Sequence, residues 1–490
     1  MVGTSTRPTG PSGPTGPVAG GRAVVLGAGM AGMLAAVALL RHVDTVTVLD
    51  RDRLPEGPDP RRGVPQAKHT HVLWSGGARL MESLLPGTVD RLLADGAHRI
   101  RLPEDLVSLT AYGWQQRMPE TQFMIAASRP LLDWTVRDQA LRDKRITVLA
   151  DTDIIGLRGD ADRITGVTYK PRTGGGMSVV EADIVVDATG RGSPMKRWLG
   201  VLGLPPVQED VIDSGMAYAT RIFAAPEGAR GPFPLVSVYA DHRAGVPGRN
   251  GILLPIERGR WMVTLSGTRG AEPPGSEAGF GDYLDSLRHP LISQLLRHAE
   301  PLTPVQASRS TANRRLFYER LVRWPDGLAV VGDAVAAFNP VYGHGMSSAA
   351  LAAAALDRTL TECGGLVPGA AQAVQRAVGA VVDTPWILAT SQDVCYPDVQ
   401  TRSEDPRLTR YAAERRRQAD TIGEAALLDP VVCSAALLVN TLSGEADALG
   451  APDVQAALAA VVGTVAPAEP TLSAAEWRAV TADDRAEAVS

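Results

Sequence analysis

The chain has 490 residues, which is too long for one ordinary domain and favours two or three. Hydrophobic residues make up 44% and charged residues 21%, so a sizeable core can form and extended disorder is excluded. The 49 basic and 54 acidic residues give a net charge of −5, which argues against a protein that binds nucleic acid by neutralising phosphates. Three widely spaced cysteines exclude a disulfide framework and a cysteine-rich zinc site, and they are typical of a reducing cytoplasm.

The beginning of the chain indicates a leader without a targeting function. Residues 1–21 are rich in Gly, Pro, Thr and Ser and lack the apolar core of a signal peptide, so they are predicted to be disordered. No apolar run approaches the ~20 residues that cross a bilayer. We therefore expect a cytoplasmic protein with no membrane span.

The first ordered segment carries the clearest motif. A buried strand at 23–26 runs into Gly-Ala-Gly-Met-Ala-Gly at 27–32, and an apolar helix follows at 33–41. A second strand at 46–49 ends in Asp50, close to the ~20-residue spacing of a dinucleotide-binding fold. The motif alone does not separate NAD from FAD.

Each glycine of this motif has a physical role. Gly27 allows a tight turn, Gly29 lets the backbone approach a pyrophosphate at the helix N-terminus, and Gly32 lets the helix pack on the strand. Asp50 can accept hydrogen bonds from the adenosine ribose. The cofactor contacts predicted in this half of the site are Gly27, Gly29, Met30, Ala31, Gly32, Asp50 and Arg51.

A second motif lies some 300 residues later. A buried strand at 328–331 leads into Gly-Asp333, then Pro340, a glycine-rich turn at 343–345 and an alanine-rich helix at 347–360. This pattern resembles the FAD signature of the p-hydroxybenzoate-hydroxylase-like flavoprotein superfamily. The resemblance implies that the aspartate holds the ribityl chain of a non-covalently bound FAD. It also implies that the turn presents backbone N–H groups to the flavin edge that becomes anionic on reduction.

The same resemblance adds further cofactor contacts. In the segment that begins Ser128-Arg129-Pro, the arginine matches the residue that reaches the FAD ribose or pyrophosphate. The predicted contacts of this second half are Arg129, Asp333, Pro340, Gly343, Gly345 and Met346. The single-component hydroxylases of the superfamily carry an Asp-Gly pair that serves both FAD and NADPH, but this chain has Thr189-Gly190 there. We therefore expect a separate flavin reductase, or at most poor reduction by NAD(P)H.

Several segments resemble one narrower family across roughly residues 22–440. They include RGVPQAKHTH at 62–71, SGGAR at 75–79, LLPG at 84–87 and FNPVYGHGMSSAA at 338–350. They resemble the flavin-dependent epoxidases of polyether ionophore biosynthesis, of the monensin and lasalocid type. The resemblance implies epoxidation of E-configured alkenes in a linear polyene polyketide, either free or bound to a carrier protein.

The predicted fold class is α/β, with a Rossmann-type FAD-binding domain, an inserted antiparallel β-sheet substrate domain and a C-terminal helical region. The FAD-binding domain is assigned to 22–100, 125–213 and 317–369, the substrate domain to 101–124 and 214–316, the helical region to 370–465, and a loose tail to 466–490. Short β-rich runs broken by Gly and Pro indicate the substrate sheet. Its candidate wall residues, of which alternation lets about half face inward, are Met216, Tyr218, Phe223, Tyr239, Ile252, Leu254 and Trp261. We expect a long, apolar cavity with few charged groups.

The chemistry requires the cofactor, because an alkene needs an electrophilic oxygen that a C4a-hydroperoxyflavin can supply and side chains cannot. No side chain is required as an acid or base, and Tyr342 and His344 are the only catalytic candidates in the flavin loop. His69 and His71 form an HxH pair, but two imidazoles without further ligands do not make a metal site, and no metal is expected.

Three alternatives remain. A flavin-dependent halogenase should carry a WxWxIP segment, and none of the eight tryptophans has another two residues away. A flavin-dependent reductase or dehydrogenase of isoprenoid double bonds is the second. A flavoprotein that only binds or senses a ligand is the third.

Overall fold

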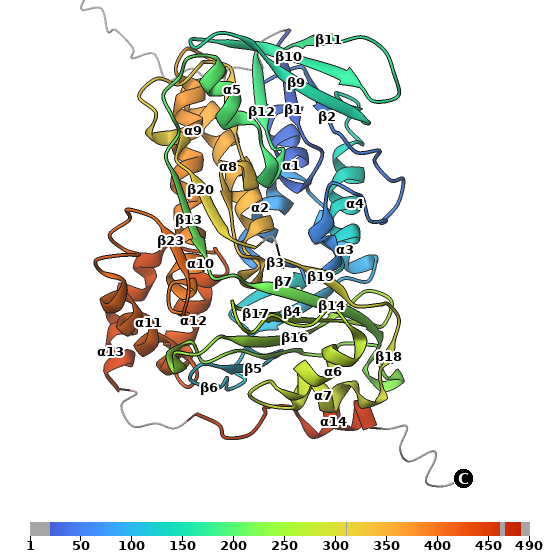
Figure 1. Ribbon diagram of the computed structural model, residues 1–490, viewed down its shortest axis with the longest axis vertical. Coiled ribbons are helices and arrows are strands. Elements are labelled where there is room, and N and C mark those ends of the chain that lie inside the picture. Colours follow the sequence, from blue (N-terminus) through green and yellow to red (C-terminus); the bar gives the residue numbers. More distant parts are fainter. Residues whose placement is uncertain (1–19, 310, 461–465, 482–490) are drawn as a thin grey trace, which may run out of the picture.

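The structure is a computed structural model that describes residues 20–309, 311–460 and 466–481. Apart from Gly20 and Gly21, the predicted leader lies outside the described residues. A parallel sheet with its helices forms the upper half of Figure 1, a large antiparallel sheet forms the lower half, and a group of helices lies beside the junction. The predicted fold class is confirmed.

The parallel sheet has five strands in the order β21-β12-β1-β2-β8. Its strands are apolar, β-branched and largely buried, as expected when both faces of a sheet are covered. Helices cover one face, and α8 lies beside both α1 and α9 (Figure 1). The bounds are β1 (Arg22–Leu26), β2 (Thr45–Leu49), β8 (Ile146–Leu149), β12 (Ile184–Asp187), β21 (Leu328–Val330), α1 (Met30–Leu39), α4 (Arg129–Ala140), α8 (Gly345–Cys363) and α9 (Ala370–Val381).

A three-stranded antiparallel sheet, which the sequence analysis did not predict, packs against β12 through its middle strand. It consists of β9 (Thr152–Gly159), β10 (Ile164–Pro171) and β11 (Ser178–Glu181). A short helix, α5 (Met195–Val201), follows β12.

The substrate sheet has eight strands, in the order β18-β14-β17-β16-β15-β5-β6, with β19 also paired to β14. All of the runs predicted for 214–316 are present. The bounds are β5 (Leu106–Thr110), β6 (Gly113–Trp114), β14 (Ala217–Ala224), β15 (Leu235–Val238), β16 (Arg249–Ile256), β17 (Arg260–Gly267), β18 (Glu300–Pro301) and β19 (Gln306–Ser308).

The end of the segment 101–124, which was assigned to the substrate domain, forms a strand of another sheet. As β7 (Gln122–Ala126) it pairs with β3 (Val72–Trp74) and β4 (His98–Leu102) in a separate three-stranded sheet. This sheet packs against the inner face of the substrate sheet, where Met124 and Leu254 share one apolar cluster. Two helices, α2 (Ser75–Leu84) and α3 (Thr88–Ala94), complete this part of the chain.

The outer face of the substrate sheet is covered by α6 (Glu277–Asp285) and α7 (Leu291–Leu295). The stretch from 466, expected to be a loose tail, also packs there over its described part. It contains α14 (Ala474–Thr481), whose Val480 is buried in the apolar cluster between the outer face and these helices. Glu476 of α14 forms an ion pair with Arg117 at 2.8 Å. The tail expectation was wrong for 466–481 because a few apolar side chains, spaced along a polar segment, are enough to dock it.

The C-terminal helical region adjoins the junction between the two sheets. Its helices are α10 (Asp383–Asp393), α11 (Ala412–Ala426), α12 (Pro430–Asn440) and α13 (Pro452–Ala460). A four-stranded sheet links this region to the rest, in the order β22-β20-β13-β23: β13 (Glu209–Asp213), β20 (Asn313–Leu316), β22 (Ala336–Ala337) and β23 (Gln400–Arg402). Within the described residues, none of the helices is both long and apolar enough to cross a membrane.

Candidate cofactor site

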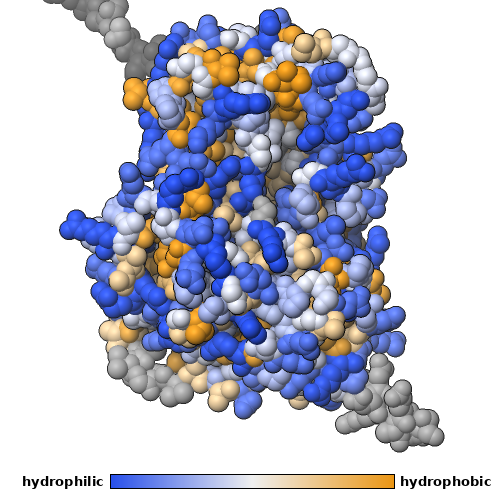
Figure 2. All heavy atoms as spheres, viewed as in Figure 1, coloured by the Kyte–Doolittle hydropathy of each residue, from blue (hydrophilic) through white to orange (hydrophobic). Residues whose placement is uncertain are grey.

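A cleft of about 840 Å³ lies at the carboxyl ends of the parallel strands, where the two halves of the predicted site meet. Figure 2 shows this face of the molecule hollowed, with hydrophilic side chains along the rim. All the predicted cofactor contacts except Gly32 line the cleft: Gly27, Gly29, Met30, Ala31, Asp50, Arg51, Arg129, Asp333, Pro340, Gly343, Gly345 and Met346. Residues more than 300 positions apart in the sequence are thus brought around one space.

The glycine turn is shaped by close main-chain contacts. Gly27 has φ +98°, and a Cβ there would lie 2.7 Å from the carbonyl oxygen of Ala188. A Cβ on Gly32 would lie 1.8 Å from the oxygen of Gly27, so Gly32 supports the turn from behind. At Gly29, by contrast, a Cβ would meet only the Arg61 guanidinium, at 3.4 Å. The space over Gly29 therefore opens into the cleft.

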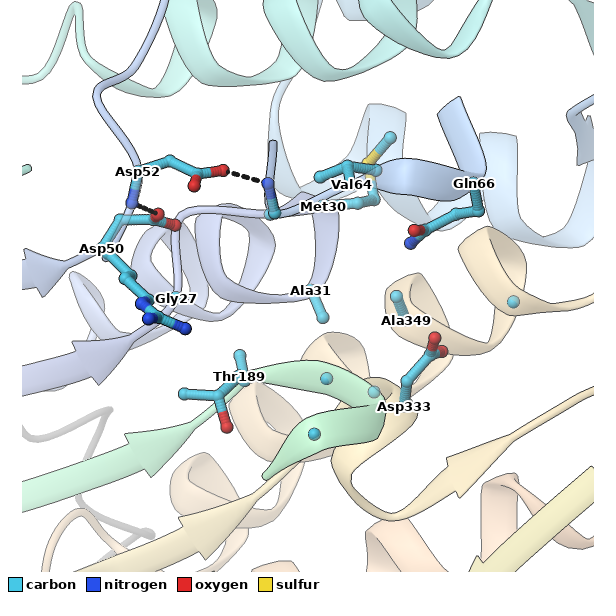
Figure 3. Close-up of a pocket in the computed structure, with 18 of the residues that line it drawn as sticks. Gly27, Met30, Ala31, Asp50, Asp52, Val64, Gln66, Thr189, Asp333 and Ala349 are labelled. Carbon is cyan, nitrogen blue, oxygen red and sulfur yellow. Dashed lines mark hydrogen bonds between the residues drawn. The ribbon is translucent and has the colours of Figure 1, made fainter. Parts of the chain in front are cut away.

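Asp50 is buried and fixed at the end of β2. Its Oδ2 accepts hydrogen bonds from the Ala28 N–H at 2.6 Å and from Arg61 at 3.0 Å, and its Oδ1 accepts from the Asp52 N–H at 2.7 Å. Figure 3 shows this group beside the glycine turn, where Asp52 in turn accepts from the Gly63 N–H. The carboxylate keeps lone pairs for ribose hydroxyls, because three donors do not exhaust its acceptor capacity.

Asp333 faces the cleft from the other side, beside Ala349 (Figure 3). Within the described part of the chain, its carboxylate makes no hydrogen bond to protein. Burial raises its pKa, and the charges of Arg191 and Arg129 act in the opposite direction. An acceptor without a partner fits a ligand that supplies hydroxyl donors, such as a ribityl chain.

The cleft is rich in arginine. Six arginines line it against four aspartates, so it favours an anionic ligand. Arg51 pairs with Asp153 at 3.1 Å, and Arg129 pairs with Asp133 at 2.8 Å on its own helix. Arg61, one of these six, was not selected in the sequence analysis, but its burial and its Nε donor make it a strong candidate for binding an anionic ligand. Its side chain is only 8% exposed, and its Nε has no hydrogen-bond partner within the described residues.

Comparisons with known proteins identify the ligand class. Residues 23–197 match the family model described as FAD dependent oxidoreductase. Protein Rv3254 of Mycobacterium tuberculosis (strain ATCC 25618 / H37Rv) is 31% identical over 427 residues, which covers 84% of this chain and 87% of that protein. The chain is an FAD-dependent oxidoreductase, of one family with protein Rv3254.

Further similarities are more distant. A kynurenine 3-monooxygenase of Salinispora arenicola (strain CNS-205) is 27% identical over 350 residues, which covers 69% of this chain and 72% of that enzyme. The flavin-dependent brominase Bmp2 aligns with a TM-score of 0.63 at 14% identity, covering 90% of this chain and 97% of the brominase. The Diels-Alderase PyrE3 of the pyrroindomycin pathway aligns with a TM-score of 0.57 at 16% identity, covering 86% and 80%. These two structures show a shared fold only.

The predicted FAD cofactor of this oxidoreductase is therefore confirmed, and the cleft fits it. When FAD binds, the glycine turn and the arginines would hold its pyrophosphate, Asp50 its ribose and Asp333 its ribityl chain. When bound, FAD supplies the redox chemistry. Within the described residues, no group of three or more His, Cys, Asp or Glu side chains is placed to hold a metal ion.

The two catalytic candidates of the flavin loop point away from the cleft. Its lining contains Pro340, Gly343 and Gly345 but neither Tyr342 nor His344. The Tyr342 hydroxyl donates to Asp393 in α10 at 2.6 Å, and the His344 ring donates through Nε2 to the Asn440 carbonyl in α12 at 3.1 Å. These contacts give both side chains a role in anchoring the loop, which leaves the chemistry to the cofactor.

The HxH pair lies at the edge of the cleft. His71 lines it, and its Nδ1 must donate to the His69 carbonyl oxygen at 2.8 Å, because a carbonyl can only accept. Burial and the nearby Arg129 charge lower the pKa of His71 to about 3, so its Nε2 is an unprotonated acceptor at neutral pH. His69 bonds Thr220 of the substrate sheet at 2.8 Å. The spacing of His69 and His71, two residues apart, was the sequence signal that pointed to these two histidines.

The predicted wall residues divide between the two faces of the substrate sheet. Phe223 and Trp261 lie in the outer cluster under α6 and α7, so they are not part of the face toward the FAD region. Leu254 and Ile252 belong to the inner cluster, and the Tyr218 hydroxyl donates to Asn339 of the flavin loop at 2.6 Å.

The remaining two wall residues are less informative. Tyr239 directly follows β15 and is half-buried, while Met216 is buried just before β14. The inner face is less apolar than expected, because Thr220, Thr264 and Thr70 form a chain of hydroxyl contacts at 2.7 Å across it.

Proposed function

We propose that this oxidoreductase is a monooxygenase that epoxidises E-configured alkenes of a linear polyene polyketide in polyether antibiotic biosynthesis. Its substrate is either free or carried on a carrier protein. The proposal combines the family resemblance of the segments at 62–71 and 338–350 with the chemistry of the sheet face beside the flavin loop.

The observation that carries the proposal is the neutral inner face of the substrate sheet. Apart from Arg260 at the start of β17, which pairs with Glu257 at 2.6 Å, the side chains that point inward from β14 to β17 are apolar, hydroxyl or amide groups. They are Tyr218, Thr220, Ile222, Ala224, Leu235, Ser237, Asn250, Ile252, Leu254, Ile256, Met262, Thr264 and Ser266. A charged substrate would need a charged partner when it is removed from water, whereas a polyene needs none. Burial of its methyl groups and alkenes, at about 25 cal/mol per Å², can supply the affinity.

In this proposal the protein orients the alkene and excludes water. Leu254, Ile256 and Met262 of the inner face are covered by β3, β4 and β7, so the substrate chain is held beside them, at the partly exposed Ile222 and Ile252. Tyr218 fixes the adjoining flavin loop through Asn339, and Leu437 of α12 packs against the same apolar cluster. FAD supplies the activated oxygen, so no side chain is asked to transfer a proton to the alkene.

We also propose that the electrons come from a separate flavin reductase. The position that serves both cofactors in single-component hydroxylases is Thr189, and its hydroxyl is used internally, donating to Asp187 at 2.6 Å. Stopped-flow mixing of the anaerobic oxidised protein with NADPH or NADH should bleach the flavin at least tenfold more slowly than mixing with an added reductase. Fast bleaching by either nucleotide alone would contradict this part of the proposal.

The decisive experiment is turnover under ¹⁸O₂. Purified FAD-loaded protein, a flavin reductase and a linear polyene with trisubstituted E-alkenes are incubated, and products are analysed by mass spectrometry. We expect one ¹⁸O atom per epoxidised alkene, and no product from an anaerobic sample or from Gly29→Val protein. A halogen isotope pattern with bromide or chloride would favour the halogenase, and labelled ring hydroxylation of kynurenine would favour the activity that the Salinispora relative is named for. Alkene reduction or desaturation without label would favour the isoprenoid alternative.

A further inference from the structure

One buried carboxylate accepts hydrogen bonds from the flavin loop and from neighbouring elements. Asp393, the last residue of α10, is 1% exposed. Its Oδ1 accepts from the Tyr342 hydroxyl at 2.6 Å, and its Oδ2 accepts from the Asn313 side chain at 2.6 Å. The Asn339 amide is shared between the two oxygens at 3.2 and 3.0 Å, and Ser214 also bonds the carboxylate. Neutral donors thus occupy both oxygens.

In the described part of the chain, no cation compensates this group. Within the described residues, the hydrogen bonds and ion pairs of Asp393 include no Arg, Lys or His. The titratable groups that face it are the phenols of Tyr342, Tyr218 and Tyr396 and the thiol of Cys395, and burial raises the pKa of each, so all stay neutral near pH 7. Burial raises the pKa of Asp393 itself to about 6. The balance between its two protonation states therefore lies within the working range of enzymes.

The carboxylate controls the turn that leads to the cleft. Asn339 donates its backbone N–H to the Asn313 side chain at 2.7 Å, and its own side-chain oxygen accepts from Tyr218 and from the Val341 N–H. Asn339 and Tyr342, at the start and end of this turn, both donate side-chain hydrogen bonds to Asp393. The next residue, Gly343, has φ +67° and lines the cofactor cleft.

We propose that Asp393 is a positioning residue whose ionised carboxylate holds the loop 339–345 in the shape that presents its glycines to FAD. A carboxylate accepts from all of these donors, whereas a carboxylic acid brings a hydrogen of its own and loses acceptor sites. Protonation should therefore loosen the loop and weaken FAD binding. The inference depends on FAD binding, which the family shows, and is independent of the proposed epoxidation.

The test measures the affinity of the apoprotein for FAD by quenching of flavin fluorescence. For the wild type, we expect the Kd to rise about tenfold between pH 7.5 and pH 5. Asp393→Asn should bind FAD at least tenfold more weakly at pH 7.5, because its amide NH2 would face the hydrogen-bond donors of Tyr342, Asn313 and Asn339. Its Kd should no longer depend on pH, because the amide does not titrate. Tyr342→Phe, which keeps the ring, should weaken binding by a smaller factor and keep the pH dependence.

The matched control is Asp383→Asn at the other end of the same helix. Asp383 pairs with Arg315 and Arg407 and makes no contact with the loop, and these arginines lower its pKa to about 2, so it does not titrate in this range. The control should lose thermal stability but keep the wild-type Kd and its pH dependence. If Asp393→Asn fails to fold, Tyr342→Phe and the wild-type pH series decide. A Kd that stays within twofold of wild type in every variant that folds, and within twofold across the pH range in the wild type, would overturn the proposal.

Discussion

The two ends of the cofactor cleft are held in different ways. At the adenosine end, the glycine turn is fixed by main-chain contacts within a short stretch, with Gly32 packed against Gly27. At the flavin end, the loop is fixed by side chains from β14, β20 and α10, with Asp393 at their centre, and by a main-chain carbonyl of α12. The first end therefore tolerates no added side chain at Gly27 or Gly32, whereas the second end depends on the ionisation and shape of distant partners.

The sharpest test of this difference is Gly29→Val. The space over Gly29 is open toward the cleft, so the fold should tolerate the side chain while the pyrophosphate site is blocked. We expect a folded protein with a wild-type circular dichroism spectrum and no detectable bound FAD after gel filtration. Gly200→Val, where a Cβ would meet nothing within 4 Å, is the control and should keep its flavin. Equal flavin content in both variants would refute the assignment of the turn.

The second test uses two carboxyl groups on one helix whose pKa values are shifted in opposite directions. The folded protein keeps the Asp393 proton up to about pH 6, whereas the unfolded chain releases it near pH 4. Between these values the folded state binds more protons, so this group lowers the free energy of unfolding as pH rises, by about 3 kcal/mol in total. Asp383, with a pKa of about 2, contributes stability that is present above about pH 4 and is lost as pH falls toward 2.

Urea unfolding of the apoprotein between pH 4 and pH 7 measures this contribution. Between pH 4 and pH 6, the free energy of unfolding of the wild type should fall, and that of Asp393→Asn should not show this fall. Asp383→Asn should show the same fall as the wild type. Identical pH slopes for the wild type and Asp393→Asn would mean that the flavin end carries no buried titrating anchor.

Asp333 is the polar contact that links the two ends. Its carboxylate has no protein partner in the described residues, so its removal should cost only its bonds to the ligand. A hydrogen bond to a charged group contributes about 1.5–3 kcal/mol, so Asp333→Ala should weaken FAD binding by at least about tenfold. Isothermal titration of the apoprotein gives the Kd, with the exposed Asp160→Ala as the control. An unchanged Kd would remove Asp333 from the site.

The smallest effects should separate the two faces of the substrate sheet. Phe223→Leu changes the outer cluster, so KM for a polyene substrate should stay within twofold of wild type. Ile252→Ala removes apolar surface from the inner face, so KM should rise several-fold with little change in FAD affinity. The reverse pattern would place the substrate on the other side of the sheet.

Local sequence was enough to predict the adenosine end, because its strand, turn, helix and acid lie within 30 residues and each follows its own periodicity. The strands of the substrate sheet were also predictable, since their β-branched runs are bounded by Gly and Pro. Which face a strand residue occupies was not, because Phe223 and Leu254 look alike until the helices that cover one side are placed. The loop lines the cleft through Pro340, Gly343 and Gly345, but the directions of Tyr342 and His344 depend on Asp393 and Asn440, which lie 50 to 100 residues further along.

The docking of α14 has a practical consequence for handling the protein. Leu472 and Val480 complete the apolar cluster on the outer face of the substrate sheet, and a Cβ on Gly228 would lie 2.6 Å from the Ala479 oxygen, so the segment fits tightly. A shortened protein ending at residue 465 would present that apolar surface to solvent and should self-associate. Such a preparation could still bind FAD normally and yet lose turnover, which would be misread as a defect of the cofactor site.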